Sequence, residues 1–171
     1  MNDAKTTYQI LPIYVNNFVF GLAHLLHFTL PPAWQLRRGF AHPEIHATHE
    51  RHGHVWIAAA DAWYILAHQE EPWLLEMHLH VQPSPPRMAE GEEWGPIARH
   101  PAVLSRRTVR RGPPWRRRDT PQWTLSWYCP ETERGFQLQI TGRVPEEAVQ
   151  DLLRAWRYLH CHPRAEQDET S

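Results

Sequence analysis

Apolar and polar residues alternate most regularly in the C-terminal third of the chain. Every second residue is apolar in the runs 122–129 and 136–140, and the polar segment 130–135 between them ends in glycine. Two period-2 runs around such a turn predict a β-hairpin. A register that pairs Cys129 with Phe136 places the apolar residues of both runs on one face, as cross-strand partners require.

The pattern then changes to helical spacing, which predicts a helix over residues 145–161. Pro145 suits the first helical position, and Glu146 and Glu147 lie at the positive end of the helix dipole. The apolar stripe at i, i+3, i+4 and i+7 consists of Val149, Leu152, Leu153, Trp156 and Leu159. Pro163 enforces the end of the helix.

Alternation also predicts a half-buried strand at 75–81 and further strands at 102–109 and 26–30. Residues 83–102 are rich in proline and are expected to form a long irregular loop. Residues 55–68 allow two interpretations, an alanine-rich helix or two strands interrupted near Asp61.

Residues 44–60 also fit two interpretations. As a hairpin with the loop 51–53, they place His49 opposite Val55, with Gly53 in the left-handed position of a three-residue loop. As a helix, they would end at Gly53. The hairpin is favoured because it matches the apolar faces of its two strands.

These elements define the expected fold. It is an α+β domain with an antiparallel sheet of five or more strands and the amphipathic helix 145–161 packed on one face. Residues 1–163 form this single domain, and residues 164–171 form a flexible polar tail.

Composition and charge exclude several classes of protein. The 171 residues carry a formal net charge of −1, which argues against a protein that coats nucleic acid or an anionic membrane. Only Lys5 is a lysine, and the other basic residues are all arginine. The most apolar early stretch, 18–30, is too short to span a bilayer, and no secretory signal is visible. We therefore expect a cytoplasmic protein without membrane insertion.

The two cysteines, Cys129 and Cys161, are too few for a disulfide scaffold. Cys129 is expected to end a strand on the core face, and Cys161 to lie beside the apolar stripe of the helix. A cytosolic protein keeps such residues reduced, so the sequence predicts two free thiols.

Two groups of histidines are candidates for metal binding. The segment 42–54 contains five, namely His42, His46, His49, His52 and His54. In the favoured hairpin these histidines scatter over both faces, so no metal is expected there. His78 and His80 share one strand face about 6.5–7 Å apart, a spacing that can clasp one ion. Glu76 could supply a third ligand only to an ion centred on His78, so the sequence leaves that ligand unidentified.

The segment 106–118 has an unusual composition, with seven arginines and no acidic residue. The predicted partner-binding residues are Arg106, Arg107, Arg110, Arg111, Trp115, Arg116, Arg117 and Arg118. Pro113 and Pro114 are poor at continuing a β-ladder, so Trp115 is expected to be held out on a loop. Clustered guanidinium groups around an aromatic ring suit an acidic protein surface or a phosphate backbone. Acidic residues of the protein itself could also form ion pairs with these arginines.

These features favour a non-enzymatic interaction module or accessory subunit that binds a protein partner through its Arg/Trp-rich and Pro-rich loops. The first alternative is a metal-dependent hydrolase that uses His78 and His80, and the second is a nucleic-acid-binding module. No cofactor is expected other than zinc or another transition metal at this histidine pair.

Overall fold

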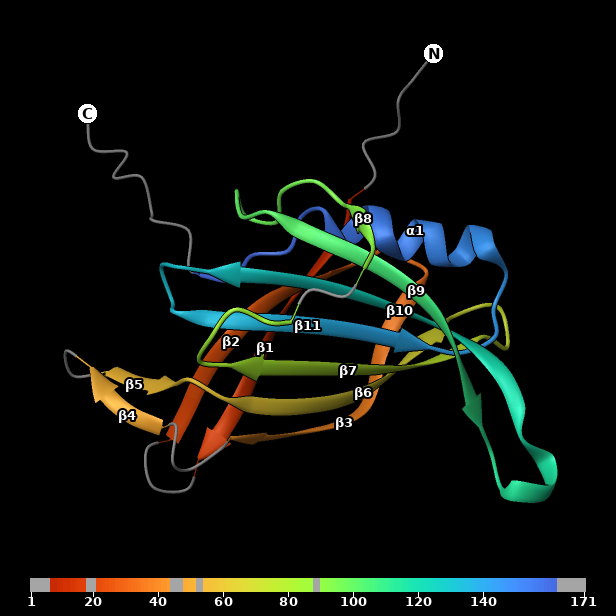
Figure 1. The fold of residues 1–171 in the computed structure, drawn as a ribbon, viewed down its shortest axis with the longest axis horizontal. Helices are drawn as coiled ribbons and strands as arrows, with labels where there is room; N and C mark the ends of the chain where they lie inside the picture. Colours follow the sequence, from red (N-terminus) through yellow and green to blue (C-terminus); the bar gives the residue numbers. More distant parts are fainter. Residues whose placement is uncertain (1–6, 18–20, 44–47, 52–53, 88–89, 163–171) are drawn as a thin grey trace, which may run out of the picture.

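The computed structural model describes residues 7–17, 21–43, 48–51, 54–87 and 90–162 (Figure 1). It is mostly antiparallel β-sheet with one C-terminal α-helix. The elements are β1 (Gln9–Asn17), β2 (Gly21–Leu30), β3 (Trp34–Pro43), β4 (Thr48–Arg51), β5 (His54–Ile57), β6 (Ala60–His68), β7 (Leu74–Gln82), β8 (Glu92–Glu93), β9 (Ala102–Arg111), η2 (Pro114–Arg116), β10 (Arg118–Cys129), β11 (Arg134–Thr141) and α1 (Glu146–Trp156). Within the described residues, the main sheet has seven strands in the order β3-β6-β7-β11-β10-β9-β8.

The buried side chains of this sheet, of the β1–β2 hairpin and of α1 form one hydrophobic cluster, and the hairpin lies behind the sheet in Figure 1. The buried side chains of the central strands are Leu75, Met77, Leu79, Val81, Trp123, Leu125, Trp127, Phe136, Leu138 and Ile140. The β1–β2 hairpin and α1 contact each other, because the Trp156 ring of α1 lies 6.1 Å from the Phe28 ring of β2. Thr29 Oγ1 of β2 also donates to the carbonyl of Ala155 at 2.5 Å.

The hairpin predicted from the two alternating runs forms, but its register differs by two residues. Cys129 pairs with Arg134 rather than with Phe136. The loop therefore has four residues, 130–133, and its last residue, Glu133, has a left-handed φ of 53°. A shift of two residues leaves every side chain on the same face, so alternation alone cannot distinguish the two registers.

The position of Gly135 accounts for the difference between the predicted loop, 130–135, and the observed one. The sequence places this glycine in the turn, whereas the structure places it in β11. A Cβ atom there would lie 2.1 Å from the carbonyl oxygen of Ser84 and 2.9 Å from Cδ of Pro86. The glycine is required by the close approach of another chain segment rather than by the turn.

The C-terminal helix is shorter than the predicted 145–161, because α1 ends at Trp156. Beyond it, the backbone of His160 pairs with that of His27 in β2, with N···O distances of 2.8 and 3.2 Å. An extended backbone is needed for this bridge, so the helix cannot continue. Leu159 is nevertheless fully buried, which is why the apolar pattern extends past the end of the helix.

Residues 48–57 form a hairpin, as favoured, but the register differs by one residue. His49 pairs with Trp56 rather than with Val55. The loop of this hairpin, residues 52–53, lies outside the described residues, as do residues 44–47 of the expected first strand.

The other predicted strands are present, and three strands, β1, β3 and the short β8, are additional to the prediction. β2, β7 and β9 contain the three predicted strands. Residues 55–68 form two strands, interrupted at 58–59, two residues before Asp61, as the second interpretation predicts. β1 and β3 have no clear alternation and were missed. Residues 83–102 are irregular apart from β8 and a tight turn at 97–100.

Two further expectations concern membranes and the chain end. None of the helices in the described part of the chain has the length and apolarity that a bilayer crossing requires. The expected polar tail, 164–171, lies outside the described residues.

His24 of β2 gives the fold an expected acid sensitivity. Its ring lies 4.4 Å from that of His27, and its pKa is lowered from 6.5 to about 4, chiefly by burial and then by the positive charges of His27 and Arg134. An unfolded chain protonates His24 below about pH 6.5, whereas a folded chain does so only near pH 4. The contribution of His24 to the free energy of unfolding is therefore fully present above pH 6.5 and is lost as the pH falls from 6.5 to 4. We expect His24→Gln to lose less stability than the wild type between pH 7 and about pH 4.5 in urea unfolding. Equal losses would contradict this assignment.

Candidate functional sites on the arm and the sheet face

β9 and β10 extend beyond the rest of the sheet as a two-stranded projection, which we call the arm (residues 108–121; Figure 1). β11 pairs with β10 only as far as Gln122, whereas the β9–β10 ladder continues to the pair Arg111–Arg118. Every residue from 110 to 119 is exposed. An isolated two-stranded ribbon is only marginally stable in water, so the arm contributes little to the core.

Trp115 lies at the tip of the arm and is 86% exposed. It belongs to the short helix η2, which follows Pro113. Gly112 precedes this turn with a φ of 106°, a conformation that glycine adopts without strain. The expectation that Trp115 is held out into solvent agrees with this position.

The arginines of the segment 106–118 divide into two groups. The first group has partners within the chain: Arg106–Glu146 at 3.5 Å, Arg110–Asp119 at 3.5 Å, Arg111–Glu76 at 3.2 Å, and Arg107 Nε donating to Gln122 Oε1 at 2.6 Å. For Arg116, Arg117 and Arg118, the described residues contain no ion-pair partner. The unneutralised positive charge therefore lies next to Trp115 at the tip.

His78 and His80 lie on the outward face of β7 together with Asp61 of β6. Asp61 Oδ1 accepts hydrogen bonds from His78 Nε2 at 2.7 Å and from His80 Nδ1 at 2.8 Å. Burial raises the pKa of Asp61, but the hydrogen bonds from His80 and His78 outweigh it, and the pKa lies below its usual value. Glu76, which the sequence offered as a third ligand, instead pairs with Arg111.

The Asp61–His78–His80 cluster has the composition of an open metal site. Its three ligand atoms lie within 4.8 Å of one another, and all three side chains are partly exposed. Two histidines and one carboxylate leave coordination positions for water or substrate on zinc or iron. The sequence identified the histidines but missed Asp61. Only the pairing of Asp61 with His80 across β6 and β7 brings this carboxylate to the site.

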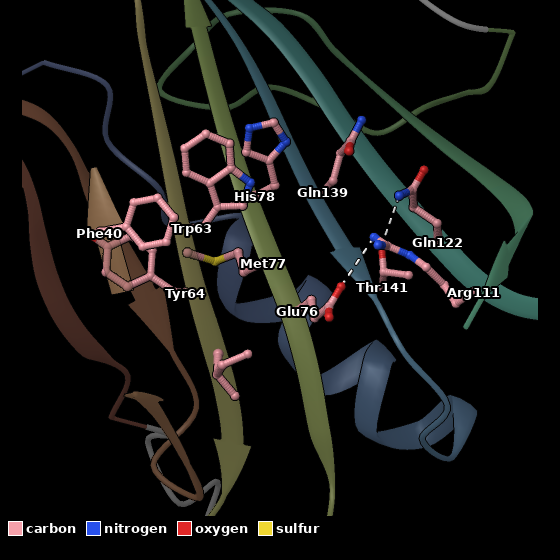
Figure 2. A pocket seen from close by; sticks show the side chains of 11 residues that line it. Phe40, Trp63, Tyr64, Glu76, Met77, His78, Arg111, Gln122, Gln139 and Thr141 are labelled. Carbon is pink, nitrogen blue, oxygen red and sulfur yellow. Dashed lines mark hydrogen bonds and ion pairs between the residues drawn. The ribbon is translucent and has the colours of Figure 1, made fainter. Parts of the chain in front are cut away.

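A row of aromatic rings continues from this cluster across the sheet. Trp63 stacks on His78 with the ring centroids 4.8 Å apart, and Phe40 stacks on Trp63 at 5.1 Å. Beside the row is a half-open pocket of about 330 Å³ (Figure 2). Its opposite wall is polar and includes Gln139, Gln122 and Thr141, which come from β11 and β10. The pocket shares His78 with the cluster, so a bound molecule would lie next to the potential metal position.

Cys129 and Cys161 are both buried and unoxidised, as expected. The pKa of Cys129 is lowered to about 4, first by a hydrogen bond from Cys161. The same interaction and burial raise the pKa of Cys161. Arg134 is buried nearby, and burial lowers its pKa to about 10 against the opposing effect of the two cysteines.

The histidine-rich segment 42–54 yields no structural test of metal binding. His46 and His52 lie outside the described residues, and the backbone of His42 pairs with Asp61 in the β3–β6 ladder. The expectation that this segment binds no metal therefore remains a prediction.

Comparisons of the chain with protein-family models, with curated proteins and with solved structures find no match in any of the three.

Proposed function

We propose that the protein is a non-enzymatic interaction module whose arm binds an acidic surface of a partner protein. The observation that carries this proposal is the exposed Trp115 at the end of a projecting ribbon, next to three arginines without ion-pair partners in the described part of the chain. Tryptophan and arginine are the residue types most enriched in interface hot spots.

The pairing of the other arginines supports a binding site at the tip. Arg106 and Arg111 bond to acids of the body, and such exposed ion pairs contribute about 0–1 kcal/mol each. Arg106 lies before the arm and Arg111 in its last ladder pair, so these contacts join β9 to the body as far as the start of the tip at Gly112. The tip then offers an apolar ring for a pocket and guanidinium groups for the carboxylates around that pocket.

The charge distribution favours a protein partner over a nucleic acid. The edge of the sheet beside β9 carries the exposed residues Glu90, Glu92 and Glu93. A long polyanion that followed the arm would meet these carboxylates and be repelled. A protein surface can contact the tip alone.

A salt titration distinguishes these partner classes. We expect no saturable binding of a labelled single-stranded oligonucleotide at low salt in fluorescence anisotropy. If the oligonucleotide binds, the logarithm of its association constant can be plotted against the logarithm of the salt concentration. A negative slope of several units would show phosphate contacts and contradict the protein-partner proposal.

Metal-dependent hydrolysis is a second candidate function, favoured by the third ligand that Asp61 supplies. A metal held by Asp61, His78 and His80 would lie beside the pocket in Figure 2 and could lower the pKa of a bound water to about 7. Trp63 and Phe40 would form the apolar wall against which a substrate lies.

The hydrolase candidate predicts a metal equivalent that depends on this cluster. Elemental analysis of untagged protein should show the loss of one transition-metal equivalent per chain in both His78→Ala and Asp61→Asn. His68→Ala is a matched control, because His68 is a β6 histidine outside the cluster. An unchanged metal content in both variants would exclude this function and leave Asp61 as a hydrogen-bond acceptor for the two histidines.

A further inference from the structure

A second group of potential ligands lies near the β10–β11 turn, where three segments that are distant in the sequence meet. His100 comes from the turn 97–100, Cys129 from the end of β10, and Cys161 and His162 from the chain that follows α1. The backbone bridge between His27 and His160 holds this last segment in place. From the sequence, Cys129 and Cys161 are predicted only as free thiols, with no link to these histidines.

Two of the distances within the group fall in the range expected for tetrahedral coordination. The four ligand atoms lie within 4.8 Å of one another. His162 Nδ1 is 3.4 Å from Cys161 Sγ and 3.6 Å from Cys129 Sγ. Zinc with bonds of about 2.0–2.1 Å to nitrogen and about 2.3 Å to sulfur has ligand–ligand separations of about 3.3–3.8 Å. The side chains could therefore take up zinc with little movement.

His100 provides an independent indication of a missing partner. Only 7% of this residue is exposed, and the described residues provide no hydrogen-bond partner for Nε2. A buried polar atom without a partner costs about 1–3 kcal/mol. The turn that presents His100 is also strained, because Ala98 and Arg99 have positive φ angles of 46° and 71°. A metal ligand at this position would account for both features.

The surroundings of His162 are those of a metal-binding histidine. Its Nε2 lies 3.0 Å from Glu131 Oε2, so the carboxylate accepts a hydrogen bond from one ring nitrogen while the other nitrogen faces the sulfurs. Carboxylates in this position orient histidine ligands and fix their tautomer. The full arrangement is thus two thiols, two imidazoles and a carboxylate behind one imidazole.

We propose that His100, Cys129, Cys161 and His162 form a structural zinc site that fastens the chain after α1 to the end of β10 and to the turn 97–100. The site is closed, because four protein ligands fill a tetrahedral shell and three of them are buried. This proposal is independent of the function of the arm and of the open cluster at Asp61.

The test uses full-length protein without a histidine tag. We expect one zinc per chain by elemental analysis, and two thiols that react only after denaturation with a chelator. Apo protein titrated with Co²⁺ alone should give the intense d–d bands of tetrahedral cobalt and a thiolate-to-cobalt charge-transfer band. A six-coordinate cobalt spectrum, or no reactive thiol because of a disulfide, would overturn the proposal.

Variants assign the zinc to this site. His100→Asn and Cys161→Ser should each reduce bound zinc to about a tenth or less, whereas the matched variant His68→Asn, at a histidine outside both clusters, should retain it. Glu131→Gln should weaken zinc binding by about 10–100-fold and leave the cobalt spectrum tetrahedral, as expected for a positioning residue. Retention of zinc in both ligand variants would contradict the proposal. If these variants do not fold, the cobalt titration of the wild-type chain still decides.

Discussion

Replacing Arg134 by alanine is expected to lower the free energy of unfolding by about 3–5 kcal/mol. The guanidinium group is almost fully buried, and its Nε donates to the carbonyl of Ile57 at 2.7 Å and its Nη1 to that of His24 at 3.0 Å. The substitution leaves both carbonyls without this donor and creates a cavity where β2, β5 and β11 meet. Chemical denaturation measures the loss.

Arg143→Ala is a matched control for this prediction. Arg143 also donates to a backbone carbonyl, that of Asp119, but it is exposed. Water can replace its hydrogen bonds, so the expected loss is at most about 0.5 kcal/mol. Similar losses for the two variants would show that Arg134 does not connect the strands in the way that the structure indicates.

The double variant Trp115→Ala/Arg116→Ala is expected to abolish capture of the partner from a lysate of the source organism. Loss of one hot-spot residue costs at least about 2 kcal/mol, or about 30-fold in affinity. Both side chains are exposed, so the melting temperature should change by no more than about 2 °C. Mass spectrometry of the captured proteins and a thermal melt measure the two effects.

The double variant Tyr158→Ala/Arg154→Ala supplies the comparison, because it also removes an exposed aromatic residue and an exposed arginine. It should retain capture of the same protein. A large loss of stability in Trp115→Ala/Arg116→Ala with capture intact would show that the tip of the arm is internal structure.

The sequence pattern predicts which face of the sheet a side chain occupies more reliably than it predicts the register of paired strands. Alternation in the 122–140 region correctly separates the buried Leu125 and Leu138 from the outward Gln137, yet the register differs by two residues. The decisive contact is the approach of Ser84 to Gly135, and no local pattern contains it. β3 was missed because its pairing shifts between Arg37 and Phe40, where the period of two is interrupted.

In the candidate sites too, the sequence predicts contacts between residues that are close along the chain but not contacts between distant ones. His78 and His80 are two residues apart, so strand geometry alone places them together. Asp61 joins them only through the pairing of β6 with β7. The proposed zinc ligands come from three segments, and only Cys161 and His162 are adjacent in the sequence.

The contacts that join β2 to the chain around the end of α1 affect the order in which the protein can fold. Thr29 and Ala155 are 126 residues apart in sequence, and the bridge from His27 to His160 spans a similar length. During synthesis the β1–β2 hairpin emerges long before these partners, with Leu25, Leu26 and Phe28 exposed to water. Such high contact order slows folding, and the waiting hairpin is open to aggregation. The apolar face of this hairpin therefore stays uncovered on a nascent chain until the segment through His160 has left the ribosome.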